Sequence, residues 1–299
     1  MFRPKLKLSW LYPRAYTKLL RKKSTNTIEI AYTVYDNGAD TAKPPLMILH
    51  AMLGARMQWD HLAKAIQETT GRKVVTVDAR NHGDSPRATE HSYINMADDA
   101  LDLVQKLGMQ KVSLHGHSMG ARTAMAMSLL RPDLVSSVSI NDMSPISTGL
   151  QIPFVLRILD CMAGVKFKPG MKTADAIQLA DESLKAIVPD EKLREYLLGN
   201  LIQSKGVTTW KVSIDALRRN FVSKLYSFPS RLKDLQFKGP TLFIGGSLST
   251  HIPKEDLPLI KEYFPSAELV YIEGANHWVH VDRPDQFLET LCKFLEENE

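Results

Sequence analysis

The stretch Lys111-Val112-Ser113-Leu114-His115-Gly116-His117-Ser118-Met119-Gly120-Ala121 joins a strand-like run to a helical pattern through a short Gly-His-Ser-Met-Gly turn. Between a buried strand and a helix, a Gly-x-Ser-x-Gly turn reverses the backbone so tightly that its flanking positions carry no large side chain, and the serine hydroxyl stands exposed. Ser118 is therefore the first candidate for a nucleophile. Because so short a pattern also arises by chance, the rest of the chain has to support it.

Strand-like and helical segments alternate on both sides of this turn. Strands are predicted over residues 27–35, 44–50, 73–79, 111–115, 135–140, 241–245 and 268–272. Helices are predicted over residues 59–70, 93–107, 119–130 and 254–264, with a closing helix that contains Phe287, Leu291 and Leu295. Most of the strands are short and apolar on both faces, as buried parallel strands are. The alternation predicts an α/β fold with a mostly parallel central sheet and helices on both faces.

The alternation is interrupted between residues 144 and 233. Only helical segments are predicted there, over residues 173–187, 190–203 and 207–221. We interpret residues 144–233 as a helical cap inserted after the sixth strand, the one that ends at Asn141-Asp142. Residues 27–143 and 234–299 then form the core. An apolar segment of the cap containing Phe154 and Ile158 either roofs an acyl pocket or only packs the cap.

The positive charge of the chain is concentrated at its start. Eight of the 38 basic residues and none of the 33 acidic residues lie within residues 1–26, so the remainder has a small excess of acid and is not expected to bind nucleic acid. Residues 1–26 are basic, acid-free and patchily apolar, as mitochondrial transit peptides are. We expect import into mitochondria, to the matrix. The alternative is a disordered tail or a surface helix of a cytoplasmic protein.

Cysteine content and hydropathy exclude two other classes of protein. The two cysteines, Cys161 and Cys292, lie far apart in the sequence, which suits a reducing compartment and not a disulfide scaffold. The most hydrophobic stretch, residues 152–165, is broken by Arg157 and Asp160, so no membrane-spanning segment is expected. No metal or other cofactor is expected either, because the histidine pair His277-x-x-His280 on a loop is a weak ligand pattern.

A serine nucleophile needs a base and a third group that orients the base. His277 is the only histidine in a small-residue loop directly after the last predicted strand, so we assign it as the general base; His280 is its nearest rival. Asp142, which ends the strand that follows the nucleophile helix, is the preferred acid. Asp215 in the cap is the alternative, because residues 247–250 offer no carboxylate.

The tetrahedral intermediate needs two backbone donors. One is expected from the amide of Met119, at the start of the nucleophile helix. The other is expected from the loop after strand 44–50, most plausibly the amide of Met52. We interpret His50 as a hydrogen-bonded packing residue, and His82, His115 and His117 as structural or pocket-lining residues.

The chain resembles α/β-hydrolases of the abhydrolase domain-containing protein 11 group, which is similar to bacterial acyl esterases and yeast ethanol acetyltransferases. The most specific match is Val77-Asp78-Ala79-Arg80-Asn81-His82-Gly83-Asp84-Ser85-Pro86; residues 116–120, 123–125, 210–217, 277–278 and 282–284 also match. The resemblance covers roughly residues 27–296. Two departures are Ala51 and Ala121, where the family has glycine, and Ala51 puts the geometry of the oxyanion loop in question.

The resemblance implies a serine hydrolase that cleaves small acyl, lipid or thioester substrates. In relatives the acid has been placed at positions matching Asp142 or Asp215, so that choice stays open. One alternative is an acyltransferase with an alcohol or thiol acceptor. The other is a non-catalytic mitochondrial scaffold, since animal members of the group are linked to the 2-oxoglutarate dehydrogenase complex.

Overall fold

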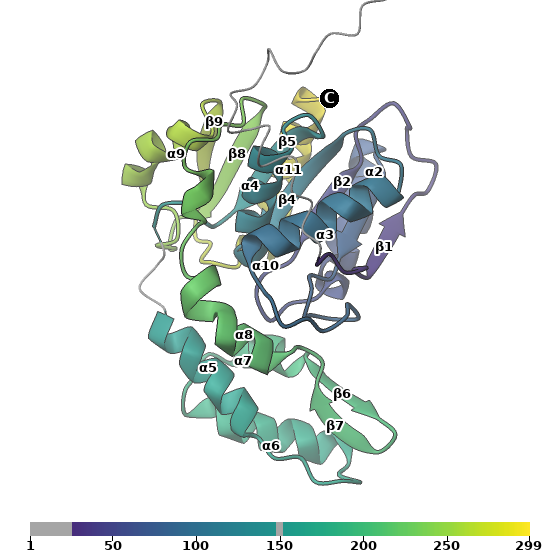
Figure 1. The fold of residues 1–299 in the computed structure, drawn as a ribbon, viewed down its shortest axis with the longest axis vertical. Coiled ribbons are helices and arrows are strands. Elements are labelled where there is room, and N and C mark those ends of the chain that lie inside the picture. The colour runs from purple at the N-terminus through teal and green to yellow at the C-terminus, as the bar shows by residue number, and fades with distance from the viewer. Residues whose placement is uncertain (1–25, 148–151) are drawn as a thin grey trace, which may run out of the picture.

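A seven-stranded sheet forms the centre of the computed structural model, which describes residues 26–147 and 152–299 (Figure 1). The strand order is β1-β3-β2-β4-β5-β8-β9, and every pairing is parallel except that of β1 with β3. The strands are β1 (Tyr32–Tyr35), β2 (Leu46–Leu49), β3 (Val74–Val77), β4 (Val112–His117), β5 (Val135–Asn141), β8 (Thr241–Gly246) and β9 (Ala267–Ile272). All seven predicted strands are confirmed.

Helices cover both faces of this sheet. Side chains alternate along each strand, so apolar strands present apolar side chains on both faces, and both faces have to be covered. On β2, Leu46 and Ile48 pack with α2 (Asp60–Thr70) and α11 (Pro284–Glu297). Met47 and Leu49 point to the opposite face, where α3 (Tyr93–Lys106), α4 (Met119–Leu130) and α9 (Leu257–Tyr263) contribute to the core. The short helix α10 (Val279–Asp282) precedes α11. The prediction of an α/β fold covered on both faces is confirmed.

The cap stands at one end of the core (Figure 1). It contains α5 (Ile152–Gly164), α6 (Thr173–Lys185), α7 (Glu191–Leu198), α8 (Ile214–Asn220), and the strands β6 (Leu201–Ser204) and β7 (Val207–Trp210). The cap is inserted after β5, which is the fifth strand of the described residues and not the sixth. The expected count was one too high because, in the described residues, β1 is the only strand before β2. No helix of the described residues is long and apolar enough to span a bilayer.

The expectation that the cap is purely helical was wrong. Residues 201–210 form an antiparallel hairpin where two helices were predicted. Its turn is Lys205-Gly206, and both residues have positive φ, 51° and 76°. Two consecutive residues with positive φ form the kind of turn whose twist matches paired strands. The predicted leader, apart from Asn26, and residues 148–151 of the predicted cap lie outside the described residues.

Candidate active site

Ser118 occupies the sharp turn between β4 and α4. Its backbone angles are φ 53° and ψ −109°, a conformation that residues with a Cβ rarely adopt. Such strain persists only where the surrounding structure enforces it, and it is commonly found at functional sites. The local geometry is therefore that of the nucleophile elbow expected from the sequence.

Two glycines make this elbow possible. A Cβ on Gly116 would lie 2.3 Å from the carbonyl oxygen of Gly120, and one on Gly120 would lie 2.1 Å from that of Leu49. Both contacts are with backbone, which cannot move aside as a flexible side chain can. The first turn of α4 therefore lies directly against the end of β2, so the elbow and the loop after β2 are in contact.

The sheet order brings Asp142 to His277 over a sequence separation of 135 residues. Ser118 follows β4, Asp142 follows the neighbouring β5, and His277 follows β9 at the edge of the sheet. Nδ1 of His277 lies 2.7 Å from Oδ2 of Asp142, whose side chain is buried. Asp215 is exposed in the first turn of α8 and makes no hydrogen bond to His277. The structure thus places Asp142, and not Asp215, beside the imidazole.

Two residues that sequence reasoning missed complete the surroundings of this pair. Ser249 donates a hydrogen bond to Oδ2 of Asp142, and the His251 ring stacks on His277 at a centroid distance of 3.8 Å and an interplanar angle of 19°. Burial lowers the pKa of His251 to about 4, so its ring is neutral near pH 7. Both lie in the loop after β8, which has no carboxylate over residues 247–250, and the position of β8 beside β5 is the signal that brings this loop to Asp142.

Ser118 and His277 line one cavity of about 1010 Å³ between core and cap, together with Met52 and Met119. The Ser118 hydroxyl has no hydrogen-bond partner within the described chain. Catalytic hydrogen bonds are often long in an unliganded enzyme and tighten when substrate binds. The amide of Met119, in the first turn of α4, lacks an intrahelical acceptor and is free to donate.

The loop after β2 is held in shape by two buried histidines. His50 contacts the Ala51 carbonyl through Nδ1 at 2.7 Å and accepts from the Ala79 amide through Nε2 at 3.0 Å, which confirms its interpretation as a hydrogen-bonded packing residue. Nε2 of His82 accepts from the Leu53 amide at 3.2 Å. Burial lowers the pKa of both imidazoles, so both rings stay neutral.

The alanine substituted for the family's glycine does not distort this loop. Among the described non-glycine residues, positive φ occurs at Leu53, Asn81, Ser118, Asp142 and Lys205, and so not at Ala51. A Cβ at that position is therefore compatible with the backbone. Ala51 therefore stands at a position whose backbone conformation does not require glycine.

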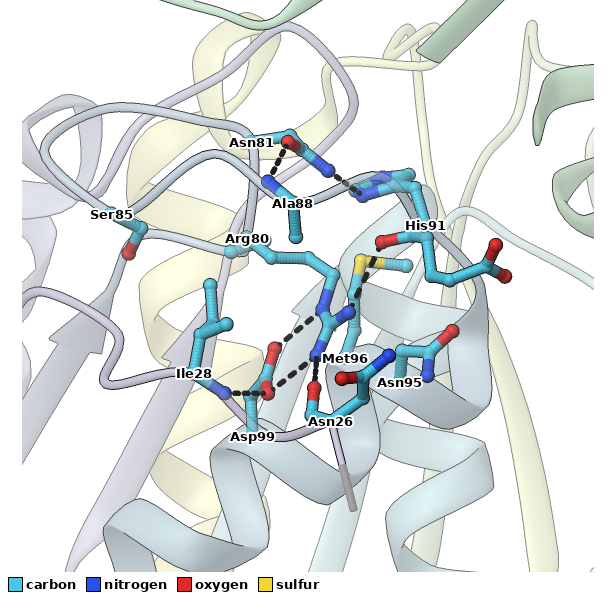
Figure 2. A network of polar contacts seen from close by, with 12 residues as sticks. Asn26, Ile28, Arg80, Asn81, Ser85, Ala88, His91, Asn95, Met96 and Asp99 are labelled. Atoms are coloured by element: carbon cyan, nitrogen blue, oxygen red, sulfur yellow. Dashed lines mark hydrogen bonds and ion pairs between the residues drawn. The ribbon is translucent and has the colours of Figure 1, made fainter. Parts of the chain in front are cut away.

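The loop over residues 77–86 is built around a buried ion pair (Figure 2). The Arg80 guanidinium contacts both carboxylate oxygens of Asp99 at 2.7 Å and donates to the backbone carbonyls of Asn26 and Glu90. Both side chains of the ion pair are about 1% exposed. None of residues 77–86 lines the large cavity. This motif therefore contacts the loop after β2 through His82 and lies outside the large cavity.

Of the histidine pair considered as metal ligands, His280 turns away from His277. Its ring stacks on Trp59 and its Nδ1 lies 3.0 Å from Nδ2 of Asn141. Among the described residues, Asp142, His251 and His277 do bring ligand atoms within 4.8 Å of one another. Nδ1 of His277 is, however, engaged by Asp142, and the rings of His277 and His251 are stacked on each other.

Comparisons with known proteins agree with this geometry. A family model described as alpha/beta hydrolase fold matches residues 44–160. The chain is 37% identical over 273 residues to the sn-1-specific diacylglycerol lipase ABHD11 of Xenopus laevis, covering 91% of this chain and 86% of that protein. It is 30% identical to ethanol acetyltransferase 1 of Wickerhamomyces anomalus, covering 89% and 72%. A solved marine microorganism esterase matches with a TM-score of 0.79 and 29% identity, covering 90% and 100%.

The fold, the site and these similarities together define a carboxylic ester hydrolase, and the chain belongs to the α/β-hydrolase family. Within that family it belongs to the abhydrolase domain-containing 11 group, and it is 35–37% identical to four proteins of that group over 90–92% of its length. The resemblance expected from the sequence motifs is confirmed.

Proposed function

We propose that this protein hydrolyses carboxylic esters through an acyl-serine intermediate on Ser118. The observation that carries the proposal is the shared cavity of Ser118 and His277, with Nδ1 of His277 engaged by Asp142. Because Nδ1 is occupied, Nε2 is the nitrogen left to accept the serine proton. Asp142 fixes this tautomer and stabilises the imidazolium that forms.

In the proposed reaction, Nε2 of His277 takes the proton of Ser118 while Oγ attacks the ester carbonyl carbon. The carbonyl oxygen becomes an oxyanion that accepts hydrogen bonds from the amides of Met52 and Met119. When the tetrahedral intermediate collapses, the bond to the alcohol oxygen breaks and His277 returns the proton to that oxygen. Water then attacks the carbonyl carbon of the acyl-enzyme while His277 accepts a proton from it. The bond to Oγ breaks and His277 returns the proton to Oγ, which releases the acid and restores Ser118.

We propose esters with a large apolar acyl group, such as lipid esters, as the substrate class. The support is the apolar side chains that the cap contributes to the cavity: Phe154, Val155, Ile158, Leu193, Leu197, Phe221 and Leu225. Apolar surface buried in such a cavity stabilises the complex in proportion to its area. A panel of p-nitrophenyl esters and acyl thioesters of increasing chain length tests this: a rise in kcat/KM from acetyl to octanoyl supports it, and the highest value at acetyl contradicts it.

A fluorophosphonate probe tests the nucleophile. Such probes phosphonylate an activated serine, so the wild-type protein is expected to gain one adduct by intact mass and Ser118→Ala none. Asp215→Asn serves as a control variant because Asp215 is exposed away from the cavity. Equal labelling of wild type and Ser118→Ala would overturn the proposed mechanism.

Transfer of the acyl group to an alcohol or thiol is the second candidate, favoured by the similarity to ethanol acetyltransferase 1. Only the nucleophile that attacks the acyl-enzyme differs between the two reactions. Gas chromatography of reactions run with and without ethanol distinguishes them: transesterification yields the ethyl ester, whereas hydrolysis yields the free acid alone.

We also propose that residues 1–26 direct the protein to mitochondria, on the ground of their basic, acid-free composition. A fusion of these residues to a fluorescent protein is expected to co-localise with a matrix marker. A diffuse cytoplasmic signal would contradict the proposal. Association with the 2-oxoglutarate dehydrogenase complex, which the resemblance implies, stays a prediction that co-purification of the full chain would test.

A further inference from the structure

Two residues of the cap reach into the core and hold the loop after β2. The hydroxyl of Tyr196, on α7, donates to the carbonyl oxygen of Met52 at 2.9 Å. Nδ2 of Asn200, just after α7, donates to the carbonyl oxygen of Leu53 at 2.7 Å. Both bonds span more than 140 residues of sequence, at separations of 144 and 147. Two successive peptide groups of the oxyanion loop are thus bound by the cap.

The bond from Asn200 is buried, and the bond from Tyr196, which also lines the large cavity, is partly buried. Asn200 is 5% exposed, and burial raises the pKa of the Tyr196 hydroxyl. A buried donor that loses its acceptor is destabilised by its desolvation, so the Asn200 side chain favours the position in which its bond is made, and the partly buried Tyr196 hydroxyl does so to a smaller extent. The hydroxyl also fits closely: a Cβ on Gly54 would lie 2.6 Å from it.

The peptide between Met52 and Leu53 is held from both sides. Its oxygen accepts from Tyr196, and its N–H, which belongs to Leu53, donates to Nε2 of His82. Leu53 has a φ of 62°, a conformation that costs energy for a residue with a Cβ and needs such support. Fixing this peptide restrains the backbone at Met52, a residue that lines the cavity, and hence the direction of its N–H.

Tyr196 also contacts the loop that carries the base. Its ring packs edge-on against Trp278 at a centroid distance of 4.3 Å, and Trp278 directly follows His277 in the chain. One cap residue therefore contacts two loops that border Ser118. The cap is not only a roof over the cavity, because it contributes to the placement of backbone in the site.

We propose that Tyr196 and Asn200 are positioning residues of the oxyanion hole, which is complete only while α7 is docked on the loop after β2. The inference rests on the proposed function, because it assigns the Met52 amide to the oxyanion. If the cap moves away from the core, the Met52 amide loses the contacts that fix its direction. If the bound substrate brings the cap back onto the core, those contacts form again. Cap closure and transition-state stabilisation are then one event.

The test uses the full chain carrying Tyr196→Phe, which removes one hydroxyl and keeps the ring, or Asn200→Ala. Asn220→Ala is the matched control: Asn220 is also a buried cap asparagine that donates to one core carbonyl, that of Thr89, and to one within its own helix. kcat and KM are measured with a p-nitrophenyl ester, and Ki with a trifluoromethyl ketone, whose adduct with Ser118 carries an oxyanion.

Each of the two variants is expected to lower kcat about tenfold, less than loss of a whole oxyanion donor, with KM within about twofold. Ki for the ketone is expected to rise in parallel with the fall in kcat, and the pH profile of kcat/KM to stay unchanged because His277 keeps its partner. Asn220→Ala is expected to match wild type in all three quantities.

Unchanged kcat and Ki in both variants would overturn the inference, as would a shifted pH profile, which would locate the effect at the base. Rates are divided by the concentration of folded protein, whose fraction is measured by circular dichroism. Asn200→Ser, which keeps a short donor, is expected to recover part of the kcat that Asn200→Ala loses. Failure of the proposed function is recognised separately, because the wild-type protein would then not label at Ser118.

Discussion

The carboxylate of Asp142 and the imidazole of His277 lie 2.7 Å apart, and they are brought together by the order of the strands. The carboxylate also accepts hydrogen bonds from the Gly246 amide, at 3.1 Å, and from the Ser249 hydroxyl. It is thus fixed on three sides and leaves the imidazole one orientation in which Nδ1 is engaged. This arrangement distinguishes the two acids that the sequence left open.

Asp142→Asn is expected to lower kcat by about 10⁴, because an amide cannot stabilise the imidazolium and favours the wrong tautomer. Asp215→Asn is expected to leave kcat within about twofold, since the exposed carboxylate of Asp215 makes no contact with the site. Steady-state kinetics of the two variants with one ester make the comparison. A larger loss in Asp215→Asn would reverse the assignment of the acid.

Ser118 is strained, so its removal should affect stability in a way that depends on the replacement. Ser118→Gly is expected to be more stable than Ser118→Ala by about 1 kcal/mol, because glycine adopts a φ of 53° without a Cβ clash. Both variants lose activity, so the difference is read from urea unfolding. Equal unfolding midpoints would show that the conformation costs nothing here.

The contact between α4 and β2 leaves no room for a methyl group. Gly120→Ala is expected to destabilise the protein by about 1–3 kcal/mol and to lower kcat, because the elbow and the oxyanion loop must move apart. Gly164→Ala, at the exposed end of α5 with nothing within 4 Å, is the control and is expected to be neutral or stabilising. Thermal unfolding and kcat decide; equal effects of both changes would contradict the packing argument.

The buried ion pair of Arg80 and Asp99 should be costly to break. Arg80→Met is expected to destabilise the protein by about 3–5 kcal/mol, because it leaves a buried carboxylate unpaired. Burial already raises the pKa of Asp99, so without its partner this carboxyl can take up a proton, and the loss is expected to be larger at pH 8 than at pH 5.

Two further variants check this explanation by chemical denaturation. Arg80→Met/Asp99→Asn is expected to recover part of the stability, since no charge is then buried. Lys211→Met, which breaks the partly exposed pair with Asp84, is expected to cost less than about 1 kcal/mol. A cost for Lys211→Met equal to that of Arg80→Met would contradict the role given to burial.

Stability is expected to fall as the pH drops below about 6.5, the ordinary pKa of histidine. Burial lowers the pKa of seven of the nine histidines, and three of them, His91, His115 and His280, reach about 3. The unfolded chain therefore binds more protons than the folded chain between these values, and each histidine contributes a slope of up to about 1.4 kcal/mol per pH unit.

Asp98, whose pKa burial raises to about 6, and Asp99, whose pKa burial also raises, act in the opposite direction but are two groups against seven. Urea unfolding at pH 7.5, 6.5 and 5.5 measures the net slope. The free energy of unfolding is expected to be lowest at pH 5.5; a constant value across this range would show that the folded and unfolded chains bind equal numbers of protons and would contradict the prediction.

The strands and Ser118 were predictable because their signals are local. Apolar runs identify buried strands, and Gly116 and Gly120 mark a turn that only small residues can form. The partner of His277 was harder, because Asp142 and Asp215 differ in their place in space and not in local sequence. The strand order, which a single chain does not reveal, separates them.

The residues missed were those whose roles depend on tertiary packing. Tyr196 and Asn200 look like ordinary residues of an amphipathic helix and its end, and Ser249 and His251 look like loop residues without a carboxylate. The hairpin over residues 201–210 was not predicted because Lys205 in its turn has a positive φ, a conformation that a lysine in the sequence does not indicate. For Tyr196, Asn200 and Ser249 the decisive contact joins parts of the chain that are remote in sequence.

The placement of residues 77–86 has a bearing on how relatives of this protein are classified. This loop carries the most specific resemblance to the group that the sequence offers, yet it contacts the loop after β2 through His82 and lines none of the large cavity. A search with this motif therefore retrieves proteins that support the loop after β2 in the same way, whatever their substrates are. Metabolic roles are better compared through α5 and α7, whose side chains border the cavity.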